Sequence, residues 1–374
     1  MRSANGTEAS RKREPCGFAT NTDEPRSRFP VYPSFSRMNT DSRQIPFDLI
    51  GVGSPIMDLL ALVPEEFLPT VAGEKGGMVL VETPEIEALV ARLPVEPVVI
   101  PGGSAANTAQ FAARLGLRTT FLGKLGNDDV ARAYRGHFAD AGIEGTHFKT
   151  GDLPNARCLS LITPDSQRTL RTNLAAAMTL RPDEISSADF AGCRHAHMEG
   201  YLFFNPALAT SVVDSVRSAG ATLSVDLASF EVVRVARDWI FGQLRTGIDV
   251  VFANEDEVRA LFETDEPYDV LARRLAAFGG TACVKLGKDG AWIARGDELH
   301  RIVPISVTDP VDTTGAGDAW AAGFLYGHLN DWPAPKAGTL GSILGAATVR
   351  HIGHALPAAE WDRIRRLVGA LADE

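Results

Sequence analysis

The nine residues from Asp312 to Trp320 combine a glycine turn with a carboxylate at the start of an apolar, alanine-rich stretch. That stretch predicts a helix, and the first four backbone N–H groups of a helix have no partner within it. These N–H groups and the helix dipole together attract anions. A carboxylate beside an anion site can take the proton from a hydroxyl, which is what phosphoryl transfer to an alcohol requires.

The same segment also has a simpler interpretation. Asp312 or Thr314 would cap the helix, and Gly315 and Gly317 would only turn the chain. Taken alone, the segment does not separate a helix cap from an anion site. If it is an anion site, the stretch Gly315–Gly317 holds the phosphate and Asp318 is the base. Other segments have to decide.

Two groups of polar residues follow predicted strands nearer the N-terminus. Asp58 lies just beyond the strand predicted at 48–53, and Gly102, Gly103 and Asn107 follow the strand predicted at 97–101. A carboxylate and an amide can hold neighbouring hydroxyl groups, and glycines let the backbone approach a ring closely. Each residue alone is equally well explained as a solvated loop or helix-surface side chain. Together they indicate contacts to a sugar.

Two later segments carry charge at predicted strand ends. Asn254 to Glu257 follow the strand predicted at 249–253 and are a candidate magnesium neighbourhood, bound through water. Acidic residues are also favoured in the first turn of a helix, which is the alternative interpretation. The segment from Lys285 to Gly290 predicts a tight hairpin, which either contacts a nucleotide or only turns the chain.

Composition excludes several classes of function. The net charge of −10 over 374 residues argues against sequence-independent nucleic-acid binding, which needs a basic surface. No apolar run reaches the ~18–20 residues of a membrane span. The four cysteines are scattered without zinc spacing, which predicts reduced thiols in the cytoplasm. No P-loop is present, and His195 and His197 are expected as core residues rather than metal ligands.

The chain divides by composition into an extension and one large domain. Residues 1–44 are rich in proline, serine and arginine and predict a disordered extension. Its acidic residues argue against a transit peptide, and Met38 is an alternative start that would leave residues 1–37 out of the native protein. Residues 45–365 are expected to form the catalytic domain, followed by a C-terminal tail over 366–374.

The domain alternates short apolar runs with helical stretches, which predicts an α/β fold with a mostly parallel sheet and helices on both faces. Ligands bind such sheets beyond the carboxyl ends of the strands, where the polar residues above are found. Residues 59–81 and 156–172 break the alternation with strands that have no helix between them. We expect them to form a small β-sheet lid that excludes water from the crevice.

From about Phe47 to Pro357 the chain resembles the ribokinase or PfkB-type carbohydrate kinases, a family that includes adenosine kinases. Residues 312–320 are similar to its C-terminal signature and residues 102–116 to its N-terminal one. The resemblance implies a three-layer ribokinase-like fold that uses ATP and Mg²⁺. It also implies that Asp318 is the catalytic base and that backbone amides from Gly315 through Ala316 and Gly317 to Asp318 form an anion hole.

The resemblance extends to the binding residues. It implies substrate contacts at Asp58, Gly103 and Asn107, with Gly102 beside them, and a magnesium role for Glu257. Asp312 and Thr314 match positions that border a K⁺ or similar cation site in some members. The expected ATP-binding residues are Asn254, Lys285, Gly287, Gly290, Gly315 and Gly317.

The sequence leaves two kinds of acceptor open, a sugar and a nucleoside. The segments Gln167–Thr169 and Asn173–Ala177 are similar to the adenosine-kinase branch, in which Arg168 would reach the phosphates from the lid. Tyr201 and Phe230 could stack on a purine. Because sugar kinases share these features, we expect a sugar as acceptor, with adenosine or another nucleoside as the alternative.

Three further expectations complete the sequence interpretation. A catalytically silent sugar- or nucleotide-binding regulator on the same fold is a second alternative, and a dehydrogenase is a distant third. The partner is expected to be a small molecule rather than a nucleic acid or a membrane. Since the lid often presents a dimer surface in relatives, a homodimer through the lid is also expected.

Overall fold

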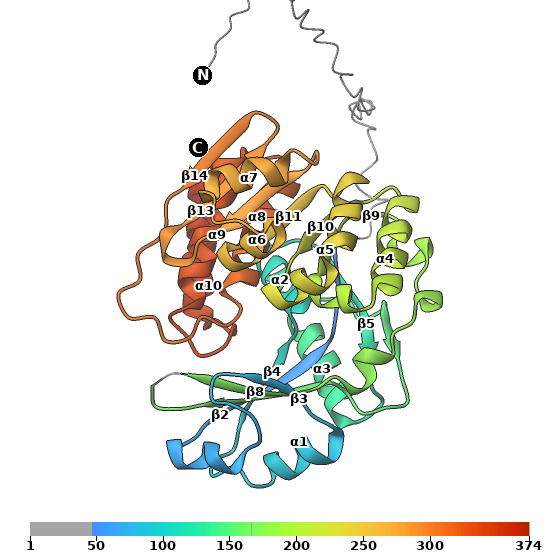
Figure 1. Ribbon diagram of the computed structural model, residues 1–374, viewed down its shortest axis with the longest axis vertical. Coiled ribbons are helices and arrows are strands. Elements are labelled where there is room, and N and C mark those ends of the chain that lie inside the picture. Colours follow the sequence, from blue (N-terminus) through green and yellow to red (C-terminus); the bar gives the residue numbers. More distant parts are fainter. Residues whose placement is uncertain (1–46, 166, 374) are drawn as a thin grey trace, which may run out of the picture. The chain divides into compact units, whose positions relative to one another are not determined.

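The computed structural model describes residues 47–165 and 167–373. The extension expected over residues 1–44 lies outside the described part. The main sheet has nine strands in the order β14-β13-β12-β11-β10-β9-β1-β5-β6 (Figure 1). Its strands are β1 Phe47–Val52, β5 Thr119–Leu125, β6 Phe148–Thr150, β9 Cys193–Glu199, β10 Thr222–Asp226, β11 Val250–Asn254, β12 Thr281–Lys285, β13 Ala291–Arg295 and β14 Glu298–Ile302.

The sheet is parallel from β6 to β12, and only the β12–β13–β14 edge is antiparallel. All residues of β1 and β5 are buried, as expected where helices cover both faces of a parallel sheet. On one face lie α4 Pro206–Ser218, α5 Phe230–Arg245, α6 Glu255–Phe262 and α7 Tyr268–Ala276. On the other lie α2 Ser104–Leu115, α3 Asp129–Asp140, α8 Ala316–Leu329, α9 Ala334–Thr348 and α10 Ala358–Asp373. The three-layer α/β prediction is confirmed.

A second, smaller sheet has five strands in the order β3-β8-β7-β2-β4 and is called the lid below (Figure 1). Its strands are β2 Ile56–Leu62, β3 Met78–Leu80, β4 Val98–Gly102, β7 Arg157–Ile162 and β8 Arg168–Asn173. The helix α1 Thr83–Val90 and a short 3-10 helix at Glu65–Thr70 cover the face turned away from the main sheet. Apolar side chains of β2 and β7 pack under them, so the lid has its own small core.

The strand predicted at 97–101 is β4, which pairs antiparallel with β2 and therefore belongs to the smaller sheet. An apolar run of that length does not say which sheet it joins. Residues 366–373, expected as part of a tail, continue α10, because Trp361, Ile364 and Leu367 recur at helical spacing and pack on the core of α8 and α9.

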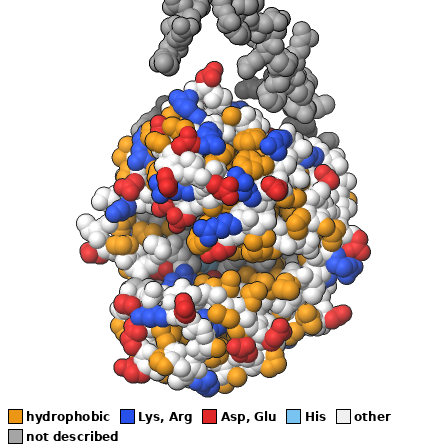
Figure 2. Space-filling model, in the orientation of Figure 1, with side chains coloured by type: hydrophobic (Ala, Val, Ile, Leu, Met, Phe, Trp, Pro, Cys, Tyr) orange, Lys and Arg blue, Asp and Glu red, His pale blue; other side chains and the backbone are white. Residues whose placement is uncertain are grey.

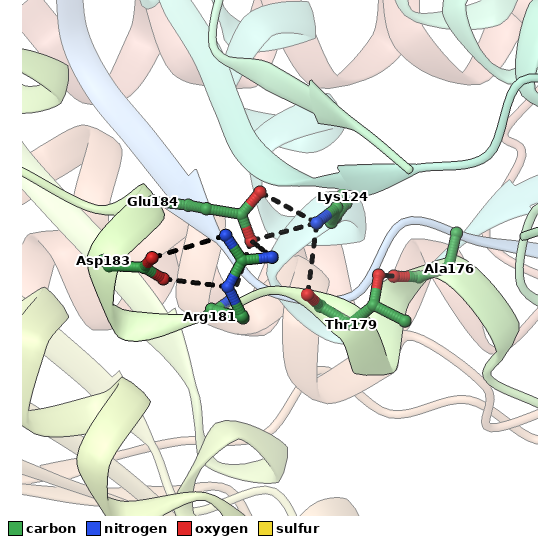
Figure 3. A network of polar contacts seen from close by, with 6 residues as sticks. All are labelled: Lys124, Ala176, Thr179, Arg181, Asp183 and Glu184. Atoms are coloured by element: carbon green, nitrogen blue, oxygen red, sulfur yellow. Dashed lines mark hydrogen bonds and ion pairs between the residues drawn. The ribbon is translucent and has the colours of Figure 1, made fainter. Parts of the chain in front are cut away.

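A buried ion pair ties the return connection from the lid to the main sheet (Figure 3). Lys124 on β5 donates from Nζ to Glu184 Oε1 at 2.8 Å and to the Thr179 carbonyl at 3.1 Å. Glu184 also accepts from the backbone N–H of Arg181, which closes a short turn. Because the Lys124 side chain is almost fully buried, this pair fixes the residues that follow β8.

The buried histidines of β9 are core residues, as expected. His195 and His197 both lie against the hydroxyl of Ser224 on the neighbouring strand β10, at 2.8 Å each. Burial lowers the pKa of both rings, so they are neutral at physiological pH. Across the described residues, none of the helices has the length and apolar character needed to cross a membrane.

Candidate active site

The candidate site forms where helices α2 and α8 begin beside each other, at the carboxyl ends of the parallel strands. The carboxylate of Asp318, in the first turn of α8, accepts from Ser104 Oγ at 2.8 Å and from Asn107 Nδ2 at 2.9 Å. Both partners lie in the first turns of α2. The base expected from the C-terminal motif and the amide expected from the N-terminal motif are therefore in direct contact.

The beginning of α8 fits an anion site better than a capped helix. Gly315 precedes the helix with φ of 71°, a left-handed conformation that favours glycine. Among the described residues no side chain caps this helix. Asp312 bonds elsewhere, accepting from the backbone and hydroxyl of Thr314 and from the Gly353 N–H. The first-turn amides of α8, at Gly317 and Asp318, thus have no side-chain acceptor, which fits a bound phosphate.

Asp318 has the electrostatics of a general base. Burial raises the pKa of its carboxyl to about 6, against the stabilising hydrogen bonds from Asn107 and Ser104. At neutral pH the group is therefore ionised, yet it is more basic than an exposed aspartate. The carboxylate is thus able to accept a proton, and its hydrogen bonds with Ser104 and Asn107 fix its orientation.

The acceptor side of the site is built on the lid strand β2 and the turn before α2. The Asp58 carboxyl packs directly over Gly102, and a side chain at Gly102 would overlap it. Burial raises the pKa of Asp58 to about 7, while Arg168 opposes the shift. The Oδ1 atom of Asn107 is buried and has no partner among the described residues. An unpartnered acceptor beside a carboxylate is suited to hydroxyl donors.

Arg168 connects the lid with the turn before α8. Its Nε donates to Ser160 Oγ at 3.0 Å, and its Nη1 lies 3.7 Å from Asp312 Oδ1. The guanidinium thus lies between the lid strands and the turn before α8. A guanidinium has five donors, so this one keeps donors for a ligand.

On the other side of Asp318, the ends of β11 and β12 bring polar and charged residues together. Lys285 ends β12, and its Nζ lies 3.3 Å from the position that a Cβ on Gly317 would take. Asn254 is the register partner of Lys285 and forms a capping box with Glu257. The backbone N–H and the side-chain amide of Asn254 donate to the two carboxyl oxygens of Glu257. Burial raises the pKa of Glu257 to about 8. The helix-start interpretation of this segment therefore holds, and a magnesium role remains a proposal.

The two hairpin glycines have different surroundings. A side chain on Gly290 would overlap the carbonyl of Ile302 in β14, so strand packing explains this glycine. Gly287 has φ of 48° and open space around it, which leaves room for a nucleotide but does not place one.

Sequence reasoning missed two buried carboxylates at strand ends. Glu199, the last residue of β9, accepts from the Ser54 N–H at 2.8 Å and from the Ala105 N–H at 3.1 Å. Asp226, the last residue of β10, lies 2.6 Å from Lys285 Nζ. The signal available for both was an acidic residue directly after an apolar strand run. Asp58, singled out for its place beyond the strand predicted at 48–53, lies within β2.

The electrostatics predict the acid limb of the activity profile. Because only ionised Asp318 accepts a proton, kcat/KM should fall below about pH 6, roughly tenfold per pH unit. The expected limb lies well above the ordinary aspartate pKa of about 4. A pH series of kcat/KM measures it, and a limb near 4 contradicts it. Asp58→Asn should keep this limb while removing any separate contribution near pH 7.

Comparison with known proteins agrees with this geometry. A model of the pfkB family of carbohydrate kinases matches residues 78–361, which is most of the chain. The chain belongs to the pfkB family. As in that family generally, its chemistry is phosphoryl transfer to an alcohol group, with ATP as the donor.

Individual members of the family are similar over most of the chain. The chain is 30% identical over 258 residues to an ATP-dependent ribose-1-phosphate kinase of Halopiger xanaduensis, which covers 67% of this chain and 81% of that protein. The solved structure of adenosine kinase from Sinorhizobium meliloti has a TM-score of 0.77 and 30% identity, covering 86% of this chain and 99% of that one. The solved structure of a probable sugar kinase from Rhizobium etli has a TM-score of 0.77 and 29% identity, covering 87% of this chain and 99% of that one.

Proposed function

We propose that this pfkB-family kinase transfers the γ-phosphoryl group of ATP to a primary hydroxyl of a sugar. The observation that carries the proposal is the position of Asp318. A buried carboxylate with a raised pKa lies in the first turn of an uncapped helix and bonds to Ser104 and Asn107 of the acceptor side. Base, phosphate site and hydroxyl-binding groups therefore share one location.

The division of labour follows from the contacts of each residue. Asp58 and the free Oδ1 of Asn107 would accept hydrogen bonds from the acceptor's hydroxyl groups and fix its orientation. Asp318 would take the proton of the reacting hydroxyl, and the first-turn amides of α8 would bind the oxygens of the phosphoryl group. Arg168 would approach the same oxygens from the lid. Mg²⁺, when bound, supplies further positive charge near the phosphates. Glu257 is the nearby carboxyl group that would hold its water, although both of its oxygens already accept from Asn254.

Other ATP contacts in the proposal are Gly287 and Gly290 of the hairpin after β12, together with Asn254. A monovalent cation beside Asp312 and Thr314 is less well supported. Both Asp312 oxygens already accept hydrogen bonds, and Arg168 stands close by. Activity in potassium and in an organic-cation salt of equal ionic strength tests this point.

A nucleoside acceptor is the second candidate, and apolar surface favours it. Tyr201 follows β9 and is 45% exposed, so its ring is available for stacking. Large apolar side chains on one face of the lid, at Leu62, Met78 and Leu80, are also exposed. Figure 2 shows hydrophobic side chains along the lid margin of the hollow beneath the main body. The same exposed face would be the contact surface if the protein is a homodimer through its lid.

An acceptor panel tests the proposed function directly. ADP release is measured with ATP and ribose, fructose, 2-keto-3-deoxygluconate, ribose 1-phosphate and adenosine, each against a reaction without acceptor. We expect turnover with a sugar, and turnover with adenosine alone would select the nucleoside alternative. Binding of acceptors without ADP release from any of them would contradict the proposal and favour a regulatory protein.

A further inference from the structure

We propose that Lys285 is a catalytic residue that contacts the transferring phosphoryl group, and that Asp226 is the positioning residue that aims it there. The inference rests on the proposed kinase function and extends it to two side chains at the strand ends. Lys285 was expected only as one of several ATP-binding residues, and Asp226 was not singled out by the sequence.

The position of the ammonium group carries the first step. Lys285 is the last residue of β12, before the hairpin, and its side chain reaches across to the first turn of α8. Its Nζ lies 3.3 Å from where a Cβ of Gly317 would be. Because the Gly317 N–H belongs to the uncapped first turn, the ammonium group and this amide can bind oxygens of the same phosphate. Gly317 also leaves the space between them free of side-chain atoms.

Asp226 carries the second step. Its Oδ2 lies 2.6 Å from Lys285 Nζ, and its Oδ1 accepts from the Ala228 N–H at 3.1 Å. The carboxylate is therefore held by its own turn as well as by the lysine, and only 4% of Asp226 is exposed. An ammonium group has three N–H donors, so Lys285 can keep its bond to Asp226 and still donate to a phosphate.

The charges around Lys285 support a cation there in the working protein. The titratable groups that face it are the carboxyls of Asp226, Glu257 and Asp318, and together they raise the pKa of Lys285 against the effect of burial. The lysine is therefore an ammonium ion at neutral pH. The simpler interpretation is an ion pair that only stabilises the fold. The position of Lys285 Nζ beside Gly317 favours the catalytic role, since an ion pair that only stabilises the fold would not have to lie at the first turn of α8.

The reaction step keeps the lysine protonated throughout. The acceptor oxygen forms a bond to the γ-phosphorus as the bond from that phosphorus to the bridging oxygen breaks, and the electron pair remains on ADP. The hydroxyl proton goes to Asp318. Lys285 donates hydrogen bonds to the phosphoryl oxygens and exchanges no proton. Its contribution is charge stabilisation of the kind that preorganised donors give.

The test replaces Lys285 by methionine, an unbranched side chain only one atom shorter that carries no charge. We expect kcat to fall by roughly 10²–10³, the usual cost of losing one such donor, while the acceptor KM changes little. Lys285→Arg should recover part of the loss. Asp226→Asn should lower kcat by about tenfold, because the lysine is then no longer held in its position. In the double variant, adding Asp226→Asn to Lys285→Met should not lower kcat further.

A binding experiment gives a readout that does not depend on turnover. Calorimetry compares ADP with a non-hydrolysable ATP analogue that keeps the γ-phosphate. In the wild type the analogue should bind more tightly than ADP. In Lys285→Met the ratio of the ADP Kd to the analogue Kd should fall about tenfold or more. Equal losses for both nucleotides, or no loss for either, would overturn the inference even if the acceptor panel has identified a substrate.

Lys124→Met is the matched control. Lys124 is also a buried lysine at the end of a strand and pairs with one carboxylate, Glu184 (Figure 3). This control should lower the melting temperature but leave kcat per folded molecule unchanged. If Lys285→Met behaves like Lys124→Met, with only stability affected, Lys285 has a structural role alone. Failure of the wild type with every acceptor would instead count against the kinase proposal, and the calorimetric comparison would still decide on Lys285.

Discussion

Replacement of Asp318 by asparagine is expected to lower kcat by roughly 10²–10⁴ while ATP still binds. Asparagine keeps the size of the side chain and an oxygen that can accept from Ser104 or Asn107. It cannot take a proton, so only the chemical step should suffer. Steady-state kinetics with the identified acceptor, together with calorimetric titration of ATP, measures the two effects separately.

Asp309→Asn is the control for this substitution. Asp309 is exposed and lies shortly before the motif, so the same chemical change is made outside the site. We expect its kcat to match the wild type. Turnover of Asp318→Asn within a few-fold of the wild type would remove Asp318 as the base and leave the carboxylate as a helix-start residue.

Gly103→Ala is expected to have the second large effect, on folding and on acceptor binding together. Gly103 has φ of 100°, and a Cβ there would overlap the carbonyl oxygen of Ser54. Strain in this backbone region costs about 1–2 kcal/mol, and the overlap adds to it because backbone atoms cannot move aside easily. We expect a loss of roughly 3–5 kcal/mol in the free energy of unfolding, with a raised acceptor KM in whatever protein folds.

Gly116→Ala separates the two causes. Gly116 ends the same helix with φ of 109°, but nothing lies within 4 Å of its Cβ position. This variant should lose only the strain contribution, about 1–2 kcal/mol, and keep its acceptor KM. Chemical denaturation of both variants gives the comparison. Equal losses in the two proteins would mean that the contact with Ser54 does not constrain the turn.

Much of the fold followed from patterns that act locally. The strand predicted at 48–53 is β1 at Phe47–Val52, because an apolar run followed by turn residues marks its own ends. The sequence predicted a strand at 97–101 but not the sheet that it joins, since the partner of a strand depends on distant residues. Residues 366–373, expected as a tail, continue the amphipathic helix α10.

The site was predictable where chemistry is concentrated in a motif. Asp318 and Asn107 were found because glycines and polar residues surround them in short stretches. Glu199 and Asp226 were missed because each is a single acid whose partners come from other elements, at Ser54, Ala105 and Lys285. Such partners become neighbours only when the parallel strands end at a common edge.

The carboxylate of Glu199 has a consequence for what the enzyme does after transfer. By accepting from the Ala105 N–H it places a carboxyl group at the beginning of α2, whereas no side chain among the described residues caps α8. Once the phosphoryl group is joined to the acceptor, this carboxyl group disfavours a phosphate on the α2 side of the site. We therefore expect weak inhibition by the phosphorylated product, and hence little loss of rate as product accumulates.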